Sequence, residues 1–442
     1  MLVKYILLLF PNMKNQKFSR VFLAAILLLA FAFSTFAQTM PKDADPKLWA
    51  RALAIHKRAI IVDGHNDIPS PMYDEDYDLA TPTVGKFHKD GDPFHTDLQR
   101  LKQSGITGEF FSIYVSGDFV KTGGSATHAL DLIDTTYRAV EKYPQELTLC
   151  TTAADIRRAK SEGKICALMG VEGGHAIENS LSALREFYRL GVRYMTLTHN
   201  NTNDWADAHH DTAKNNGLSD FGKDVVREMN RLGMLVDISH VSAKTMSDVL
   251  DVSTAPIIAS HSDARALNDH TRNIPDEILK RIAKNGGVVM INFYPSFLDA
   301  RTNKEENERD ARLKPQVDAL RAQFKDDEDY HKAVRKLYAA NPIYIAPYTR
   351  IVDHIDYIKN LIGIDYIGIG SDFDGVPFLP AGMNGMEDLP LVTYEMLRRG
   401  YTEQEIRKVL GENFLRAFAE AEKVAKINSR QISGEGNLRK IK

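Results

Sequence analysis

The chain has 442 residues, of which 43% are hydrophobic and 26% are charged, and its formal net charge is −3. This composition is typical of a globular protein that is long enough for one large α/β barrel or two domains. The near-neutral charge, without a dense Lys/Arg block in the body of the chain, argues against a nucleic-acid partner.

The first 37 residues have the pattern of a secretory signal peptide. Basic residues precede an apolar run that ends at Phe33, and small residues follow at Thr35 and Ala37. We expect cleavage after Ala37. An uncleaved anchor is the alternative, although the run is short for a membrane span of about 20 residues. The basic C-terminus lacks the hydrophobic tail of a GPI signal. An exported protein without a stable membrane anchor, periplasmic or secreted, is therefore predicted.

Eight short apolar runs alternate with amphipathic segments along the rest of the chain. They are apolar almost throughout, as in parallel strands that are buried on both faces. The runs cover residues 60–62, 108–115, 165–171, 194–197, 234–238, 256–259, 288–293 and 366–369. Helical patterns occur between them, for example at 181–190, 221–232, 243–250, 276–283 and 354–361.

This alternation predicts a (β/α)8 TIM-like barrel that forms a single domain over residues 38–425. A doubly wound open sheet is the alternative, but its polar residues would cluster at one switch point, whereas here they follow many strands. Residues 296–344 are highly charged and predict a helical insertion before the last strand. Residues 426–442 lose the apolar period and are predicted to form a flexible tail.

Cys150 and Cys166 are the only cysteines. Export makes a disulfide between them possible. A buried free thiol is equally consistent with the apolar run around Cys166. Two cysteines are too few for a thiolate metal site.

Histidines and acids follow six of the eight predicted strands. Because the strand ends of a barrel converge on one mouth, these side chains are expected to meet there. The residues are His65 and Asp67 after the first strand, Glu172 after the third, His199 after the fourth, His240 after the fifth, His261 and the later Arg272 after the sixth, and Asp372 and Asp374 after the eighth.

Imidazole and carboxylate groups are good ligands for zinc and similar cations. The count fits two metals that share Glu172, with His65 and Asp67 on one and His240 and His261 on the other. Such metals lie about 3.5–4 Å apart, and a bridging hydroxide between them can attack a carbonyl carbon.

Each of these residues also has a structural explanation when taken alone. A histidine at a strand end is more often a hydrogen-bonded structural residue, Glu172 could cap a helix, and the loop at Asp372 could be mistaken for a weak calcium loop. The remaining polar and aromatic candidates are expected to lie outside the ligand set. We predict loop or surface positions for His175, His209, His210 and His270, possible pocket walls or ordinary packing for Trp205 and Tyr294, and an outward orientation for Asn66.

Six segments resemble the membrane (renal) dipeptidase family of zinc dipeptidases. The segments are VDGHNDIP, GVEGGH, YMTLTHNN, LVDISHVS, PIIASHS and GIGSDFDGV, in the family's order between about residues 48 and 418. The resemblance implies an amidohydrolase-like barrel with two Zn²⁺ per chain that hydrolyses dipeptides. The mammalian members are GPI-anchored, disulfide-linked dimers, so this chain resembles a bacterial exported member, for which a non-covalent homodimer is possible.

The resemblance also implies a role for each matched residue. His65 and Asp67 would bind the first zinc, Glu172 would bridge, and His240 and His261 would bind the second. His199 would contact the carbonyl oxygen or the developing oxyanion, Arg272 would bind the terminal carboxylate, and Asp372 would contact the amino terminus and handle protons. An amide or lactam hydrolase acting on other carboxylate-ended molecules is the alternative activity.

Overall fold

The protein is described here by a computed structural model that covers residues 40–434. The predicted signal peptide and the last eight residues of the predicted tail lie outside these described residues. The compact unit that contains the site begins at Asp45.

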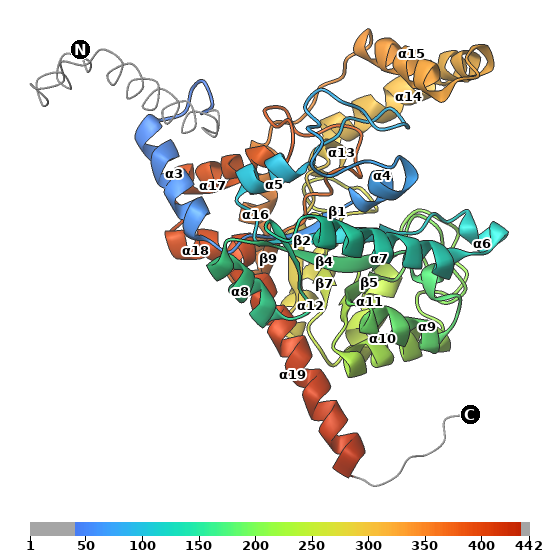
Figure 1. The fold of residues 1–442 in the computed structure, drawn as a ribbon, viewed down its shortest axis with the longest axis vertical. Coiled ribbons are helices and arrows are strands. Elements are labelled where there is room, and N and C mark those ends of the chain that lie inside the picture. The colour runs from blue at the N-terminus through green and yellow to red at the C-terminus, as the bar shows by residue number, and fades with distance from the viewer. Residues whose placement is uncertain (1–39, 435–442) are drawn as a thin grey trace, which may run out of the picture. The chain divides into compact units, whose positions relative to one another are not determined.

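Eight parallel strands close into a barrel in the order β1, β2, β4, β5, β6, β7, β8 and β9, with β9 pairing again with β1 (Figure 1). Their bounds are β1 Val62–Asn66, β2 Gly108–Tyr114, β4 Ile165–Glu172, β5 Val192–Thr196, β6 Leu235–Asp237, β7 Ile258–Ala259, β8 Val288–Ile291 and β9 Ile367–Ile369. The predicted barrel is thus confirmed, and the closure excludes the open sheet.

Helices cover the outside of the barrel and connect its strands. The first half of the chain contributes α3 Pro46–Arg58, α4 Pro69–Asp74, α5 Leu98–Ser104, α6 Phe119–Thr122, α7 Ser125–Lys142, α8 Ala153–Glu162, η1 Gly174–Ile177 and α9 Leu181–Arg189. The second half contributes α10 Asp220–Leu232, α11 Ala243–Val252, α12 Asp276–Asn285, α13 Pro295–Leu298, α14 Ala300–Gln323, α15 Asp327–Ala339, α16 Thr349–Ile362, η2 Ile364–Tyr366, η3 Met386–Asp388, α17 Pro390–Arg398, α18 Glu403–Arg407, η4 Lys408–Glu412 and α19 Asn413–Gly434.

The helix α10 shows how the sequence produces these units. The Ser219 hydroxyl accepts a hydrogen bond from the Gly222 amide at the start of the helix, and Gly233 ends it with a φ of 85°. A serine cap and a left-handed glycine satisfy the otherwise unpaired groups at the two ends of a helix. The apolar face carries Val225, Val226 and Met229, which are fully buried, so the helix packs against the barrel as its apolar period predicts.

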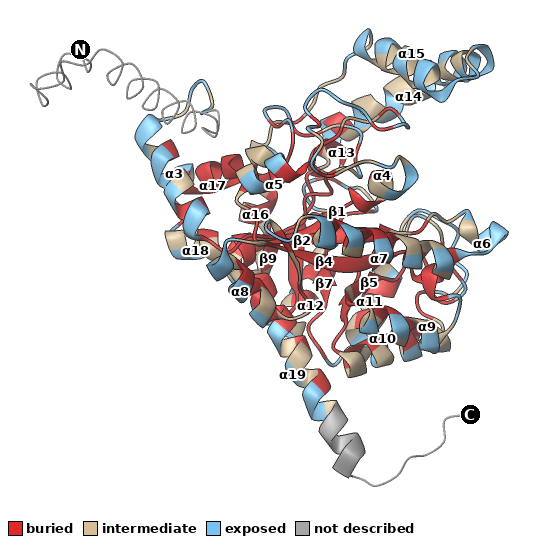
Figure 2. Ribbon diagram, in the orientation of Figure 1, coloured by how far each residue is buried: buried red, intermediate tan, exposed pale blue. Residues whose placement is uncertain are grey.

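The lower part of the barrel is closed by apolar side chains. Phe110 of β2 contacts Tyr194 of β5 and Phe414 of α19, with ring centroids 4.8 and 5.4 Å apart. All three belong to one buried cluster that also includes Phe418. Figure 2 shows the strands buried throughout, whereas the surrounding helices expose one face. This apolar cluster fills the barrel below the carboxyl ends of the strands, where the predicted site residues lie.

The predicted insertion is helical and lies between β8 and β9. Its helices α13, α14 and α15 are drawn in yellow and orange in Figure 1, and α14 and α15 are largely exposed in Figure 2. Thr302 and Leu313 are the buried residues of α14.

Cys150 and Cys166 form a disulfide, with their Cα atoms 5.4 Å apart. This bond resolves the alternative that the sequence left open. The bond connects the segment after β3 (Leu147–Leu149) to β4. The strand β3 pairs with the first residues of β4, and β5 pairs with the later residues of β4. The short β3 was not predicted, because three residues are too few to show a period.

Most strand bounds differ from the predicted ones by one to four residues, and two differences bear on the site or the tail. The strand β1 extends to Asn66, so His65 lies within it, because its pairing with β2 continues past the apolar residues. The predicted flexible tail starts at residue 426, but α19 continues to Gly434. No glycine or proline occurs between residues 413 and 433 to end the helix earlier. Among the described residues, no helix combines the length and the apolar character that a membrane crossing needs.

Candidate active site

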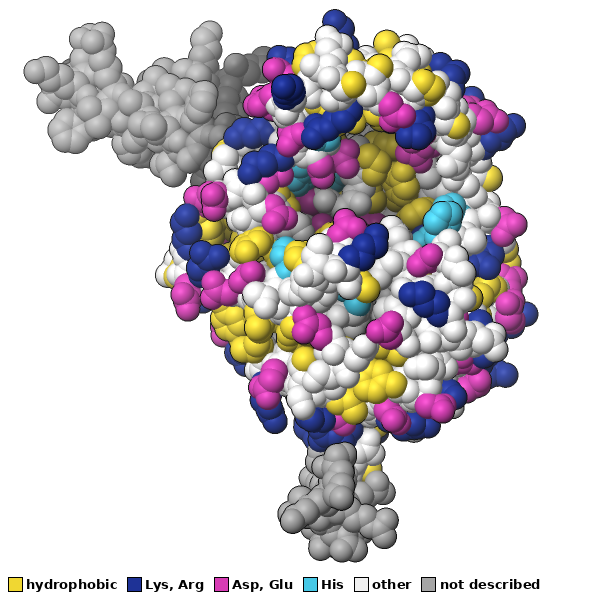
Figure 3. All heavy atoms as spheres, turned by 90° about the vertical axis from the view of Figure 1, so that its right-hand side faces the viewer, with side chains coloured by type: hydrophobic (Ala, Val, Ile, Leu, Met, Phe, Trp, Pro, Cys, Tyr) yellow, Lys and Arg dark blue, Asp and Glu magenta, His cyan; other side chains and the backbone are white. Residues whose placement is uncertain are grey.

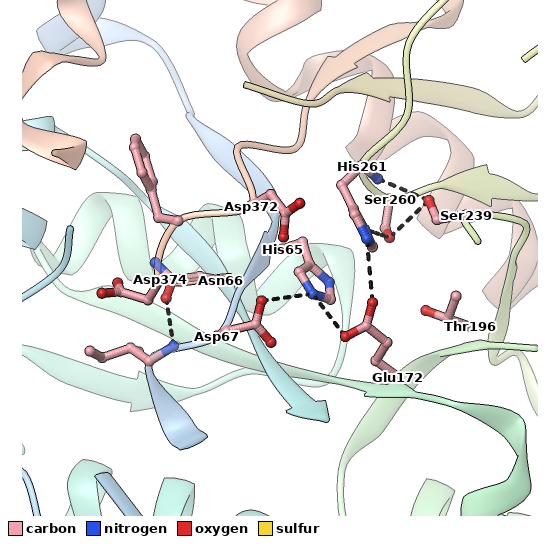
Figure 4. A network of polar contacts seen from close by, with 12 residues as sticks. His65, Asn66, Asp67, Glu172, Thr196, Ser239, Ser260, His261, Asp372 and Asp374 are labelled. Atoms are coloured by element: carbon pink, nitrogen blue, oxygen red, sulfur yellow. Dashed lines mark hydrogen bonds and ion pairs between the residues drawn. The ribbon is translucent and has the colours of Figure 1, made fainter. Parts of the chain in front are cut away.

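The carboxylate of Glu172, at the end of β4, lies at the centre of the predicted site (Figure 4). Its Oε2 is 3.4 Å from His65 Nε2, and its Oε1 is 2.9 Å from His240 Nε2 and 3.4 Å from His261 Nε2. The Nε2 of His65 is also 3.3 Å from Asp67 Oδ2. The two oxygens of Glu172 therefore face two different sets of ligands, as a bridging carboxylate would.

Three overlapping groups of side chains have ligand atoms within 4.8 Å of one another and could each hold a metal ion. They are His65, Glu172 and His261; Glu172, His199 and His240; and His65, Asp67 and Asp372. The structure thus brings together all five residues predicted as metal ligands, with His199 and Asp372 beside them.

The protonated nitrogen of His261 is fixed by a chain of hydrogen bonds. The Ser260 hydroxyl donates to Asp237 Oδ2 at 2.6 Å, and Asp237 also accepts from the Ser239 and Ser260 amides. Since a hydroxyl has one proton, Ser260 Oγ must accept from His261 Nδ1, which is 2.6 Å away. The lone pair of His261 is therefore on Nε2, which faces Glu172.

His65 is oriented in the same way by Tyr194. The Tyr194 hydroxyl donates to the Gly64 carbonyl at 3.0 Å, so it accepts from His65 Nδ1 at 2.8 Å. The tyrosine reaches this position across the barrel because Gly170 has no side chain: a Cβ there would lie 2.0 Å from the Tyr194 ring. The lone pair of His65 Nε2 is again directed into the site.

His240 completes the set. Its Nδ1 donates to Asn200 Oδ1 at 3.1 Å, which leaves the lone pair on Nε2. The backbone of His240 has a φ of 64°, and that of Asp372 a φ of 67°. Left-handed backbone is rare in residues other than glycine and is concentrated at functional sites. The fold therefore holds both side chains in orientations that an ordinary strand end would not provide.

Burial shifts the pKa values of two acids of the site, Glu172 and Asp372, upward. Burial raises the pKa of Glu172 to about 7, against the opposing effect of His65. Burial also raises the pKa of Asp372. Burial alone would lower the pKa of His65, but Tyr194, Glu172 and Asp67 outweigh it and raise that pKa well above its usual value. The carboxylates thus favour a positive charge near His65 Nε2, which either a proton or a metal ion can supply.

The imidazoles of His199, His240 and His261 stay neutral. Burial, assisted by Arg272, lowers the pKa of His199 to about 3 and that of His240 well below its usual range. Burial and the neighbouring His65 do the same for His261. Neutral imidazole is the form that binds metals.

Arg272 is a buried cation with unused donors. Its side chain is 1% exposed, and its Nη1 donates to Ser262 Oγ at 3.0 Å. Its Nε and Nη2 have no hydrogen-bond partner, and burial lowers its pKa. A buried guanidinium with free donors is well suited to bind a carboxylate in two-point fashion.

The site opens into a cavity of about 330 Å³. Figure 3 shows a hollow in which acidic and histidine side chains lie beside an apolar patch. The cavity is lined by Asp67, Ser70, Asp90, Asp92, Tyr114, Glu172, His199, Asn200, His240, Tyr294, Phe297, Asp372, Asp374, Gly375, Val376 and Pro377. Gly375 keeps it open, because a Cβ there would lie 2.2 Å from Asp67 Oδ2.

The secondary candidates take up different positions around the site. His175 is buried rather than at the surface, because it turns under the loop and contacts the Ser116 carbonyl. Trp205 packs beneath Gly174 and does not line the cavity. His209 lies beside the site, because its amide donates to the His240 carbonyl. Tyr294 lines the cavity, which is one of the two positions that the sequence left open for it.

Asn66 is turned away from the ligands, as predicted: its Nδ2 donates to Thr96 Oγ1 at 2.8 Å. Asp374 is buried and accepts from the His95 amide. The residues that sequence reasoning missed are those behind the ligands, namely Tyr194, Asn200, Asp237 and Ser260. The only available signal was the proximity of Asp237 and Ser260 to the histidines in VDISH and ASHS.

The family model for membrane dipeptidase (peptidase family M19) matches residues 49–431. Among solved structures, the probable dipeptidase PvdM from Pseudomonas aeruginosa is 27% identical, with a TM-score of 0.71, and the match covers 86% of this chain and 100% of that one. Dipeptidase AC, a metallopeptidase of family M19, is 26% identical, with a TM-score of 0.66 and coverage of 82% and 98%.

A metallopeptidase from Rhodobacter sphaeroides, solved with a phosphinate mimic of the dipeptide L-Ala-D-Ala, is also 26% identical. Its TM-score is 0.64, and the match covers 82% of this chain and 99% of that one. The family model spans the whole barrel, including every candidate ligand. The chain therefore belongs to the membrane dipeptidase family, peptidase family M19.

Proposed function

We propose that this protein is a zinc dipeptidase with two metal ions. The observation that carries the proposal is the convergence of three histidine Nε2 lone pairs on the two oxygens of Glu172. The residues fit such ions, because His65 Nε2 is buried without a hydrogen-bond partner and the Nδ1 of each histidine is already occupied. Membership of the family supports a metallo-dipeptidase.

His65 and Asp67 would hold one ion, His240 and His261 the other, and Glu172 would contact both. Nitrogen and oxygen donors of this kind suit zinc. When bound, the ions would polarise the peptide carbonyl and make a water acidic enough to attack it near neutral pH.

The two ends of the substrate would be recognised by opposite charges. Arg272 has free donors at Nε and Nη2 for the terminal carboxylate. Asp372 uses Oδ2 to accept from Asn292 Nδ2 at 2.8 Å, which leaves Oδ1 for the amino group. A longer peptide cannot satisfy both charges at once, so the pocket selects dipeptides by length.

His199 and Asp372 would act on the reacting atoms. His199 is neutral, so it can donate one N–H hydrogen bond to the carbonyl oxygen as negative charge develops there. As a carboxylate, Asp372 can take up the proton that a water releases, and burial, which raises its pKa, helps it to hold that proton until the departing amine accepts it.

We also propose that the protein is exported and works in the periplasm or outside the cell. The disulfide between Cys150 and Cys166 supports this proposal, since such bonds persist in oxidising compartments.

The direct test is hydrolysis of a dipeptide panel that includes L,L and L,D pairs, by protein purified in zinc, with and without a chelator. Cleavage that the chelator abolishes and zinc restores is expected, with about two zinc ions per chain by metal analysis. Inactivity on the whole panel in the presence of metal would refute the proposal. Cleavage of N-acylated amides in place of free dipeptides would favour the amide-hydrolase alternative.

A further inference from the structure

Glu306 of α14 bonds the charged insertion to a wall of the candidate active site. The Tyr294 hydroxyl lies 2.7 Å from both carboxylate oxygens of Glu306 and donates to them. The Ser296 hydroxyl donates to the same carboxylate. Tyr294 and Ser296 belong to the segment that follows β8, so the insertion is bonded directly to a wall of the cavity.

Tyr294 is the centre of that wall. Its ring packs edge to face on Phe297, with centroids 4.9 Å apart, and against Phe378 at 5.4 Å. Tyr294 and Phe297 line the cavity together with Val376 and Pro377. This part of the cavity wall is apolar, whereas the candidate ligands Asp67, Glu172 and His240 line another part. A substrate that is bound at the ligands therefore meets the apolar wall with its side chains.

Glu306 is held firmly in place. Its side chain is 13% exposed and lies 3.8 Å from the Arg309 guanidinium. That guanidinium stacks on Tyr338 of α15, 4.3 Å from the ring centroid. Burial and Glu306 raise the pKa of Tyr294, so its hydroxyl keeps the proton that it donates. The position of the Tyr294 ring thus depends on both helices of the insertion.

We propose that Glu306 is a positioning residue for Tyr294, and that through this contact the insertion determines which side chains the pocket accepts. The wall fits dipeptides that carry a large apolar side chain, which would pack on Tyr294 and Phe297. This inference rests on the proposed dipeptidase function and adds its substrate class.

The test compares Glu306→Ala with Glu308→Ala in full-length protein. Glu308 is on the same helix, its side chain is 66% exposed, and its nearest cation, Lys304, is 3.8 Å away, so it is a matched control. For each variant, kcat and KM are measured on a small dipeptide such as Gly-Gly and on one with leucine or phenylalanine side chains. We expect Glu306→Ala to raise KM for the large apolar dipeptide and to change the ratio of the two kcat/KM values on the order of 10-fold. Glu308→Ala should leave the ratio at the wild-type value.

Two further variants separate positioning from general destabilisation. Tyr294→Phe should change the ratio in the same direction, and adding Glu306→Ala to it should have little further effect, because the shared hydrogen bond is already lost. Glu306→Gln, which can still accept one hydrogen bond, should restore part of the ratio. An equal loss of activity on both dipeptides, or additive effects in the double variant, would overturn the inference. A wild-type protein that cleaves neither dipeptide would overturn the proposed function and this inference with it.

Discussion

The Nε2 atoms of His240 and His261 lie 3.0 Å apart, and neither carries a proton for the other. The Nδ1 proton of His240 is donated to Asn200, and that of His261 to Ser260. Two lone pairs that face each other at this distance repel unless a cation accepts both. The relationship therefore indicates a metal-binding arrangement more directly than the identity of the residues does.

Asp67→Ala should remove metal and activity together. Asp67 follows β1, lies 9% exposed and contacts His65 Nε2 through its carboxylate. We expect the loss of at least one bound ion per chain and a fall in kcat/KM by several orders of magnitude. Metal analysis and dipeptide hydrolysis measure the two effects. Asp74→Ala, an exposed position at the end of the adjacent helix α4, serves as the control. A variant at Asp67 that kept both ions would contradict the assignment.

Asp237→Asn should weaken metal binding through the wrong tautomer of His261. Oδ1 of Asp237 accepts two backbone amides, so the new amide nitrogen must take the position of Oδ2 and donate to Ser260. The Ser260 hydroxyl then donates its hydrogen bond to His261 Nδ1. A neutral imidazole whose Nδ1 accepts a hydrogen bond carries its proton on Nε2, the atom that faces Glu172. Metal affinity should fall about 10–100-fold, as measured by competition with a chromophoric chelator.

The control for this change is Asp251→Asn, on the surface of α11, where the side chain is 66% exposed. It should bind metal like the wild type. Equal metal affinity in Asp237→Asn and Asp251→Asn would show that Asp237 does not orient the ligand.

Glu172→Gln should alter the pH dependence of stability in chelator-treated protein. Burial raises the pKa of Glu172 from 4.5 to about 7, so the folded state favours the protonated acid. A raised pKa contributes stability that is complete below the unfolded pKa and is lost as the pH rises through the folded value. Between pH 4 and 8, the wild-type protein should therefore lose roughly 3 kcal/mol relative to the Gln variant.

Urea denaturation of both metal-free proteins at a series of pH values measures this difference. Since both proteins share all other titrating groups, their subtraction isolates Glu172 together with the part of the His65 pKa shift that Glu172 causes. A difference that stayed constant with pH would show that the acid is not held in a desolvating environment.

Arg272→Met should raise KM for free dipeptides. The variant keeps an unbranched apolar side chain but removes the guanidinium, whose Nε and Nη2 have no hydrogen-bond partner among the described residues. We expect kcat/KM to fall about 100-fold, which corresponds to the loss of charge-assisted hydrogen bonds. Dipeptide amides provide the control, because the variant should treat amides and free acids almost alike. An unchanged KM would mean that Arg272 does not bind the substrate.

The double variant Cys150→Ala/Cys166→Ala should lower stability without affecting metal binding. The cysteines are 16 residues apart, and closing a loop of this length stabilises a protein by about 3 kcal/mol. Cys166 lies near the beginning of β4, whereas Glu172 is its last residue, so metal content should not change. Denaturation with and without a reductant tests this prediction: the reductant should lower the stability of the wild type and leave the double variant unchanged.

Much of the site could be predicted because its residues follow predictable strands. Glu172 comes directly after one apolar run and His261 two residues after another, and parallel strands in a barrel place such positions at one mouth. Their proximity follows from the strand order alone. His65 lies at the mouth as predicted, although β1 extends to Asn66 and is longer than predicted. Side chains two residues apart on a strand lie on the same face, so the argument that pairs His65 with Asp67 does not depend on where the strand ends.

The residues behind the ligands could not be predicted in this way. Tyr194 is inside a strand and reads as an ordinary core residue, because its contact with His65 requires the missing side chain of Gly170 on the neighbouring strand. His209 lies in a loop, as expected, but nothing in the sequence of that loop shows that its amide donates to the His240 carbonyl. Both contacts join segments that are far apart in the sequence, and the hydrophobic period of one segment does not show which distant segment it will contact.

By itself, the sequence determined the barrel and the common location of the candidate ligands, because hydrophobic period and strand order are local properties of the chain. Only the tertiary structure decided which nitrogen of each histidine faces Glu172, that Cys150 and Cys166 are bonded, and that Glu306 of the insertion contacts Tyr294. Those features depend on hydrogen bonds and packing between distant segments, and such contacts are defined only when the whole barrel has closed.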